Sequence, residues 1–201
     1  MSETYDVTIA TVRPGTHPRA LAALEKTLAN DPGLLACWYC DIGALNRILI
    51  IRTSAAVAIE DRFAALNARS PFGIGEFVTE LSLDTYVSLD FMPPLRAGAF
   101  GPCYEVRSYV LKPDGLAPTI ELWRKAVPGR ARVSPVLAAM IAVTGAAIRF
   151  LHIWPYKSFD ERARLREKSV AEGVWPPPGG PGHLVSQQAD IYLPAAFSPL
   201  R

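Results

Sequence analysis

Polar and apolar residues follow two different periods along this chain. In stretches such as TYDVTIATV (residues 4–12) and FLHIWPY (residues 150–156), the character of the side chains alternates, which is typical of strands. In HPRALAALEKTL (residues 17–28), apolar residues recur at the spacing of an amphipathic helix. The alternating stretches predict strands at residues 4–12, 34–42, 46–53, 77–89, 103–111, 135–143, 148–155 and 184–193. The helical spacing predicts helices at residues 17–29, 55–68, 116–127 and 158–171.

The order strand, helix, strand, strand, helix, strand therefore occurs twice, and the sequence itself repeats. Residues 5–28 align without a gap on residues 104–127, each beginning with Tyr, an acid and Val and reaching a basic residue and Pro before the helix. Both copies end with an Asp, a Tyr and a Phe ahead of PPLR or SPLR. The segment MPPLRAGAFGP is a linker between them. We therefore predict two halves, residues 1–97 and residues 98–201.

Each half has the βαββαβ order of a ferredoxin-like sandwich, in which a four-stranded antiparallel sheet carries both helices on one face. Such a half leaves its other sheet face bare. Two halves in one chain can cover each other's bare faces. We predict an α+β protein in which two tandem ferredoxin-like halves form an intramolecular dimeric α/β barrel.

Three segments of the second half and one of the first carry a family resemblance. YEVRSYVLKP, FLHIWPYKSFDERARLR and the ending LPAAFSPLR resemble the NIPSNAP family, and WYCDIGALNRILI is similar to a strand pair of the same family. The resemblance implies the dimeric α/β-barrel fold, which the family shares with small stress-response barrels, monooxygenases and heme-handling enzymes. It does not imply one reaction, because one fold hosts many functions.

The two halves depart from the family pattern in opposite ways. The first half has IIRT, residues 50–53, where the family has His-x-Trp-x-Tyr. The second half keeps His152, Trp154 and Tyr156, but its second strand, within residues 137–148, has only the plain sequence LAAMIAVTGAAI. Duplication followed by specialisation predicts one asymmetric site instead of two equal ones.

Alternation along the strands assigns side chains to the two sheet faces. We expect the aliphatic residues Val106, Leu151 and Ile153 to lie under the helices, which would turn their neighbours toward the barrel interior. The first and third strands of a half are neighbours, so the polar and aromatic side chains of both would converge there. The predicted catalytic residues are His152 and Arg107. The predicted ligand-binding residues are Tyr109, Trp154, Gln188, Tyr192 and Trp38.

This mixture suits a small, partly apolar metabolite with an anionic or carbonyl group, bound in the barrel cavity. Arg107 can fix the anion, and His152 is the side chain that titrates nearest neutral pH and so suits general acid or base catalysis. A buried packing role for His152 and a structural ion pair of Arg107 with Glu105 or Asp190 are the alternatives. The competing functions are a non-catalytic small-molecule carrier and a protein-interaction or assembly module.

Charge and composition narrow the range of partners. The 201 residues carry a net charge of +2, spread along the chain, so we expect no nucleic-acid partner. No apolar run approaches the ~20 residues of a membrane span, and the N-terminus has no signal-peptide core, so we expect no membrane span and a cytoplasmic protein. The two-half chain could still pair as a homodimer.

The cysteines and histidines give no pattern typical of a metal site. Cys37 and Cys40 have C-x-x-C spacing, but on a strand they point to opposite faces, too far apart for a disulfide. The three histidines, His17, His152 and His183, have no paired spacing. We expect no metal and no bound cofactor, although a single histidine would suffice as an axial heme ligand.

Overall fold

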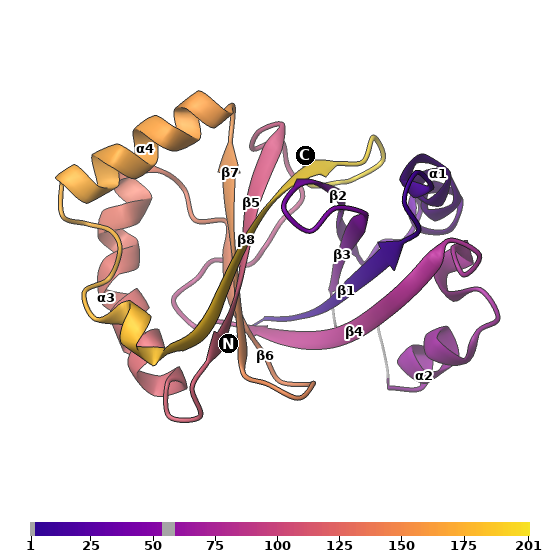
Figure 1. The fold of residues 1–201 in the computed structure, drawn as a ribbon, viewed down its shortest axis with the longest axis horizontal. Coiled ribbons are helices and arrows are strands. Elements are labelled where there is room, and N and C mark those ends of the chain that lie inside the picture. The colour runs from indigo at the N-terminus through magenta and orange to yellow at the C-terminus, as the bar shows by residue number, and fades with distance from the viewer. Residues whose placement is uncertain (1–2, 54–58) are drawn as a thin grey trace.

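The computed structural model describes residues 3–53 and 59–201. Its strands are β1 (Thr4–Val12), β2 (Leu34–Ile42), β3 (Arg47–Thr53), β4 (Val78–Ser88), β5 (Cys103–Leu111), β6 (Ala138–Ala142), β7 (Arg149–Tyr156) and β8 (Leu184–Pro194). Its α-helices are α1 (His17–Leu28), α2 (Ile59–Asn67), α3 (Leu116–Val133) and α4 (Phe159–Ala171) (Figure 1). Each predicted element is present in the described residues, and the start of the helix predicted at residues 55–68 lies outside them.

One helix differs from its prediction in a way that matters for the site. We expected α3 to end at residue 127, before Pro128, because proline has no backbone N–H to donate. The helix instead continues through Pro128 to Val133. Val127 and Arg130 are buried on this last part of the helix, so tertiary packing outweighs the local cost of the proline.

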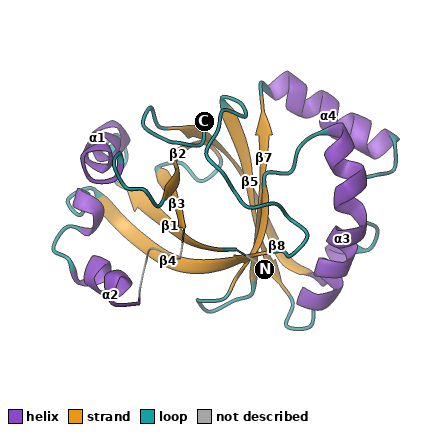
Figure 2. Ribbon diagram, turned by 180° about the vertical axis from the view of Figure 1, so that it is seen from behind, coloured by secondary structure: helices purple, strands orange, loops and turns teal. Residues whose placement is uncertain are grey.

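The eight strands form one closed antiparallel barrel in the order β1-β3-β2-β8-β5-β7-β6-β4. The strands β1 to β4 are therefore adjacent in the order β4-β1-β3-β2, and β5 to β8 repeat this order as β8-β5-β7-β6. Pairing of β2 with β8 and of β4 with β6 closes the ring. The helices lie outside the barrel, α1 and α2 on one side and α3 and α4 on the other, as Figure 2 also shows from behind. The prediction of an α+β barrel is confirmed.

Side chains from all eight strands fill the barrel interior. The cluster contains Trp38, whose indole stacks on Tyr104 with ring centroids 4.2 Å apart, and it also contains Val106, Leu151 and Ile153. The predicted faces of β5 and β7 were therefore reversed, and the expectation of a ligand cavity inside the barrel is wrong. A closed eight-stranded barrel is just wide enough to be filled by side chains, and its full enclosure favours apolar side chains, aromatic as well as aliphatic. Glu105, Arg107 and Tyr109 of β5 and Phe150 and Trp154 of β7 face α3 and α4 instead.

Two aspartates hold the hairpin turns across the junctions between the two sets of four strands. Asp190 of β8 accepts a hydrogen bond from the backbone N–H of Ala44, in the turn between β2 and β3, at 2.9 Å. Asp84 of β4 accepts from the Thr144 hydroxyl at 2.9 Å and from Nη1 of Arg149 at 2.8 Å, at the turn between β6 and β7. Each set of strands thus stabilises a hairpin of the other.

The Asp84 contacts predict an acid-dependent contribution to stability. Burial alone would raise the pKa of Asp84, but the hydrogen bonds from Arg149 and Thr144 outweigh it and the pKa is lowered. A lowered pKa contributes stability above the unfolded-state value of ~3.9, and this contribution is lost as the pH falls through the folded-state value. We expect Asp84→Asn to lower the free energy of unfolding at pH 7 by ~1–3 kcal/mol, and by progressively less below about pH 4.

Urea unfolding between pH 2.5 and 7 measures this difference. Asp90→Asn is the matched control, since Asp90 pairs with Arg124 on the surface and its loss should change stability little. A pH-independent difference between the wild type and Asp84→Asn would contradict the prediction.

Candidate functional site

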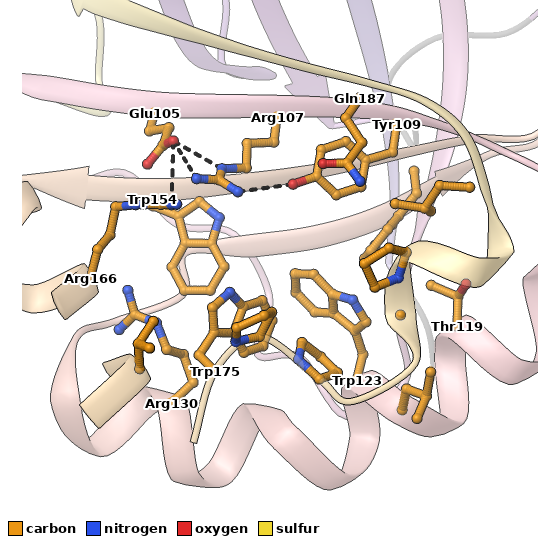
Figure 3. Close-up of a pocket in the computed structure, with 18 of the residues that line it drawn as sticks. Glu105, Arg107, Tyr109, Thr119, Trp123, Arg130, Trp154, Arg166, Trp175 and Gln187 are labelled. Carbon is orange, nitrogen blue, oxygen red and sulfur yellow. Dashed lines mark hydrogen bonds and ion pairs between the residues drawn. The ribbon is translucent and has the colours of Figure 1, made fainter. Parts of the chain in front are cut away.

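A cavity of about 260 Å³ lies between the outer face of the barrel and the two C-terminal helices. Its floor is formed by β5, β7 and β8, its sides by α3 and α4, and its cover by the loop WPPPGGPG, residues 175–182 (Figure 3). This volume exceeds the ~150 Å³ of an apolar cavity that accommodates benzene, so the space can hold a ring with a substituent or a second ring.

Three indole rings form the apolar part of the wall. Trp123 comes from α3, Trp154 from β7 and Trp175 from the covering loop. The Trp175 ring centroid lies 4.8 Å from that of Trp123 and 5.2 Å from that of Trp154. Aromatic rings from a strand, a helix and a loop therefore surround the space with large flat surfaces, which suit a planar or chain-like apolar body.

The polar part of the wall is centred on the buried carboxylate of Glu105. Its side chain is 1% exposed, and its Oε1 accepts from Nε and Nη2 of Arg107 at 2.9 and 2.7 Å. Arg162 donates to both of its oxygens at 3.0 and 2.8 Å, and Arg166 lies 3.8 Å away. Nη1 of Arg107 also donates to the Tyr109 hydroxyl at 2.9 Å (Figure 3). One carboxylate therefore faces three guanidinium groups, which leaves this region positive.

A further guanidinium, that of Arg130, lines the cavity from the last turns of α3. Arg130 is 2% exposed, and its Nη1 donates to the backbone carbonyl of Ser134 at 3.3 Å. Its Nε has no hydrogen-bond partner among the described residues. Its Cζ lies 4.6 Å from the Trp154 ring centroid, a cation–π contact, and burial lowers the pKa of its guanidinium. The Tyr156 hydroxyl lies close to this cation, but no carboxylate in the part of the chain that the structure describes forms an ion pair with it.

His152 lies behind the wall and does not line the cavity. It is 1% exposed, and its Nδ1 accepts a hydrogen bond from the Trp154 indole N–H at 2.6 Å. Burial, followed by the nearby charge of Arg107, holds the pKa of His152 well below its ordinary value of 6.5. The imidazole is therefore neutral and fixes the orientation of Trp154. Its Nε2, which has no hydrogen-bond partner in the described chain, is enclosed by rings and does not fit an axial heme ligand.

The structure separates the predicted site residues into two groups. Arg107, Tyr109 and Trp154 come together at the cavity, with His152 behind them. The other three predicted ligand-binding residues lie elsewhere, which corrects their assignment to the same site: Gln188 is exposed and donates to Asp190, and Tyr192 and Trp38 are buried in the barrel interior. Tyr192 and Trp38 face the barrel interior as predicted, whereas the predicted residues of β5 and β7 lie on the opposite face of the sheet. Gln187, the neighbour of Gln188, lines the cavity instead.

Sequence reasoning missed several cavity residues. Arg130 follows Pro128, beyond the predicted end of its helix, and Trp175 lies in a loop whose path no periodicity indicates. Arg166 belongs to DERARLRE, which has the charge spacing of a solvated helix face. Its spacing of four from Arg162 is the one available signal, because it places both guanidinium groups on the same side of α4.

The corresponding space in the first half is almost closed. It measures about 20 Å³, enough for about one water molecule, beside an ion pair between Asp6 and Arg62. Asp6 aligns with Glu105. In the second half, Trp154 is the strand partner of Glu105. In the first half, Arg52 is the strand partner of Asp6, so a charged side chain takes the place of the indole. Of these two equivalent spaces, the one under α3 and α4 has ligand size.

Metal-binding, membrane and thiol chemistry have little support in the described residues. They contain no group of three or more His, Cys, Asp or Glu side chains placed to hold a metal ion. No helix in the described ranges is long and apolar enough to cross a membrane. Cys37, Cys40 and Cys103 are free and buried, and burial raises the pKa of the Cys37 and Cys40 thiols to about 12.

The chain is similar to known proteins in sequence and in fold. Residues 104–199 match the NIPSNAP family model. A protein NipSnap homolog of Dictyostelium discoideum is 29% identical over 72 residues, which is 36% of this chain and 32% of that protein. Protein NipSnap of Drosophila melanogaster is 26% identical over 104 residues, which is 52% of this chain and 36% of that protein. The chain thus matches about a third of the length of these curated relatives.

A solved structure covers nearly the whole chain. A proposed monooxygenase from Lactobacillus acidophilus superposes with a TM-score of 0.62 over 96% of this chain and 94% of that chain, at 10% sequence identity. At this identity, the likeness shows the fold alone. It shows that another protein has a similar fold over nearly its whole length.

The buried histidine gives a prediction about stability near pH 6. An unfolded His152 binds a proton below about pH 6.5, whereas the folded neutral imidazole does not until much lower pH. The free energy of unfolding should therefore fall with decreasing pH below 6.5, by about 1.4 kcal/mol per pH unit from this group. We expect His152→Asn, whose amide oxygen can take the place of Nδ1, to lose this slope.

Urea unfolding at half-unit steps from pH 5 to pH 7.5 measures how the free energy of unfolding changes with pH. His183→Asn is the control, because it leaves His152 and Trp154 in place and should keep the wild-type slope. An unchanged slope in His152→Asn would show that the imidazole is not buried in its neutral form.

Proposed function

Because the chain belongs, through residues 104–199, to the NIPSNAP family, whose fold dictates no single reaction, we propose its function from the cavity. We propose that it binds or transforms a small, partly apolar metabolite with an anionic or carbonyl group, in the space under α3 and α4 and without a bound cofactor. The observation that carries the proposal is the composition of the wall, in which three indoles face several arginines and one carboxylate that is already paired. Such a wall favours a ligand with a flat apolar body and a negative end.

The proposal includes how the fold provides a single site. We propose that residues 1–97 and residues 98–201 are tandem ferredoxin-like halves that together imitate a homodimer. The repeated strand order supports this, and so does the alignment of Asp6 with Glu105. The second half keeps the ligand-sized cavity, and the first half supplies the other wall of the barrel. A cytoplasmic location and pairing of two such chains remain parts of the proposal.

We propose different roles for the two predicted catalytic residues, direct ligand contact for Arg107 and an indirect role for His152. Arg107 and the Tyr109 hydroxyl line the cavity and can contact a bound carbonyl or carboxylate. His152 acts through Trp154, so we assign it a positioning role. A carrier that binds without chemical change is the alternative, and a protein-interaction or assembly module is a third possibility.

Blocking the mouth of the cavity tests the proposal. Val170 of α4 lines the cavity and is 62% exposed, so Val170→Trp should fill the entrance without burying a new group in the core. Val143→Trp is the matched control, since Val143 is 59% exposed at the end of β6 and lies away from the cavity. We expect calorimetric titration with phenylacetate, octanoate, 2-naphthoate and their neutral amides to show saturable binding for at least one pair, weakened at least tenfold in Val170→Trp only.

Native mass spectrometry of the purified chain adds a second measurement. A small molecule retained by the wild type and by Val143→Trp, but absent from Val170→Trp, would support the proposal, and its recovery unchanged after incubation would favour the carrier. Absence of both probe binding and any retained molecule would overturn the proposed function.

A further inference from the structure

Arg130 presents the strongest unmet chemical requirement in the molecule. A buried cation normally has a carboxylate partner, because a close opposite charge is the strongest compensation for the cost of removing the cation from water. Among the described residues, the oxygens of Glu105 are occupied by Arg107 and Arg162, and Arg130 takes part in no ion pair. The Trp154 ring offsets part of the cost on one side of the guanidinium.

The direction of the unused donors limits what can complete the group. The guanidinium carbon lies over the Trp154 ring, and Nη1 donates to the Ser134 carbonyl. The Tyr156 hydroxyl also interacts with this guanidinium. Nε still has no hydrogen-bond partner among the described residues, although Arg130 is almost completely buried and lines the cavity. Nε and Nη2 share one edge in a fixed fork, which matches two oxygens of one planar anion.

Resting on the proposed function, we propose that the ligand is a compact planar carboxylate. Its carboxylate takes the free edge of Arg130, and its one- or two-ring body lies among the indoles of Trp123, Trp154 and Trp175. Beyond the arginine side chains, the wall is mostly aromatic and aliphatic, which suits a single negative charge better than the three-oxygen, doubly charged end of a phosphate ester. The volume of about 260 Å³ sets the size limit of the body.

Arg166 has a separate role at the entrance. Its side chain is 42% exposed and lies 3.8 Å from Oε1 of Glu105, a weaker contact than those of Arg107 and Arg162. In the view of Figure 3, Arg166 and Arg130 lie toward one end of the cavity and Thr119 toward the other. An exposed cation beside the entrance attracts anions from solution, so Arg166 should speed association of a carboxylate without providing its final contact.

Three probes of the same shape test the assignment. Titration calorimetry compares 2-naphthoate, its neutral amide 2-naphthamide and 2-naphthyl phosphate. We expect the carboxylate to bind at least tenfold more tightly than the amide and more tightly than the phosphate. In Arg130→Met the carboxylate should bind no more tightly than the amide, whereas Arg132→Met, on the exposed side of the same helix, should keep the wild-type preference.

The design separates the carboxylate assignment from the proposed function. If acid and amide bind equally and Val170→Trp blocks both, the proposed function stands and the assignment to Arg130 fails. Tighter binding of the phosphate, or a preference for the carboxylate that survives in Arg130→Met, would also overturn it.

The Arg130→Met variant should fold, because replacing a buried unpaired charge by an apolar side chain of similar size removes a desolvation cost. Arg130→Lys provides a second measurement, since it keeps the charge but lacks the fork. It should retain only part of the preference, several-fold below the wild type. Full retention in Arg130→Lys would show that charge alone, without the planar fork, selects the ligand.

Discussion

Closure of the barrel decides which face of each strand is available to a ligand. Once β2 pairs with β8 and β4 with β6, one face of every strand is enclosed on all sides and can hold only tightly packed, mostly apolar groups. Trp38 and Tyr104, stacked across the middle, belong to this enclosed layer. The other face is covered only by two helices on each side, and incomplete cover is what leaves a cavity. The polar chemistry of β5 and β7 therefore lies under α3 and α4, outside the barrel.

The layer between barrel and helices is packed differently on the two sides of the barrel. Under α1 and α2, small and aliphatic side chains such as Leu24 and Ile50 close the layer, and the acid on the first strand has one main partner, Arg62. Under α3 and α4, Trp123 stands where the alignment places Leu24, and Glu105 has three arginines around it. Large rigid rings cannot close the space as aliphatic groups do, so the layer stays open around them. The difference between a packed layer and one with a cavity therefore lies in a few side chains, such as Leu24 and Trp123.

Much of this architecture can be predicted from the sequence, because period-two alternation and the internal repeat are properties of the backbone order. The order of the strands in the barrel and the position of Arg107 beside His152 follow from the order of the elements along the chain. The side of the sheet that each residue faces cannot be predicted in this way. Leu151 and His152 alternate in the same pattern whichever face of the strand is enclosed. Arg130 and Trp175 also escape prediction: tertiary packing carries α3 past Pro128, and a loop of prolines and glycines has no periodicity that places its one indole. The local sequence pattern predicts the helices and strands, whereas the face of each strand that becomes enclosed depends on the complete barrel.

The aspartates at the two hairpin turns bear on how the molecule comes apart. Asp190 holds the turn at Gly43 and Ala44, and an added Cβ at Gly43, where φ is +112°, would clash with an Asp190 carboxylate oxygen. Asp84 holds the opposite turn through Thr144 and Arg149. Neither set of four strands therefore has a complete hairpin without the other. Separation of the two sets would expose a carboxylate and an apolar sheet face on each of them at the same moment, so we expect the barrel to open and close as one cooperative unit.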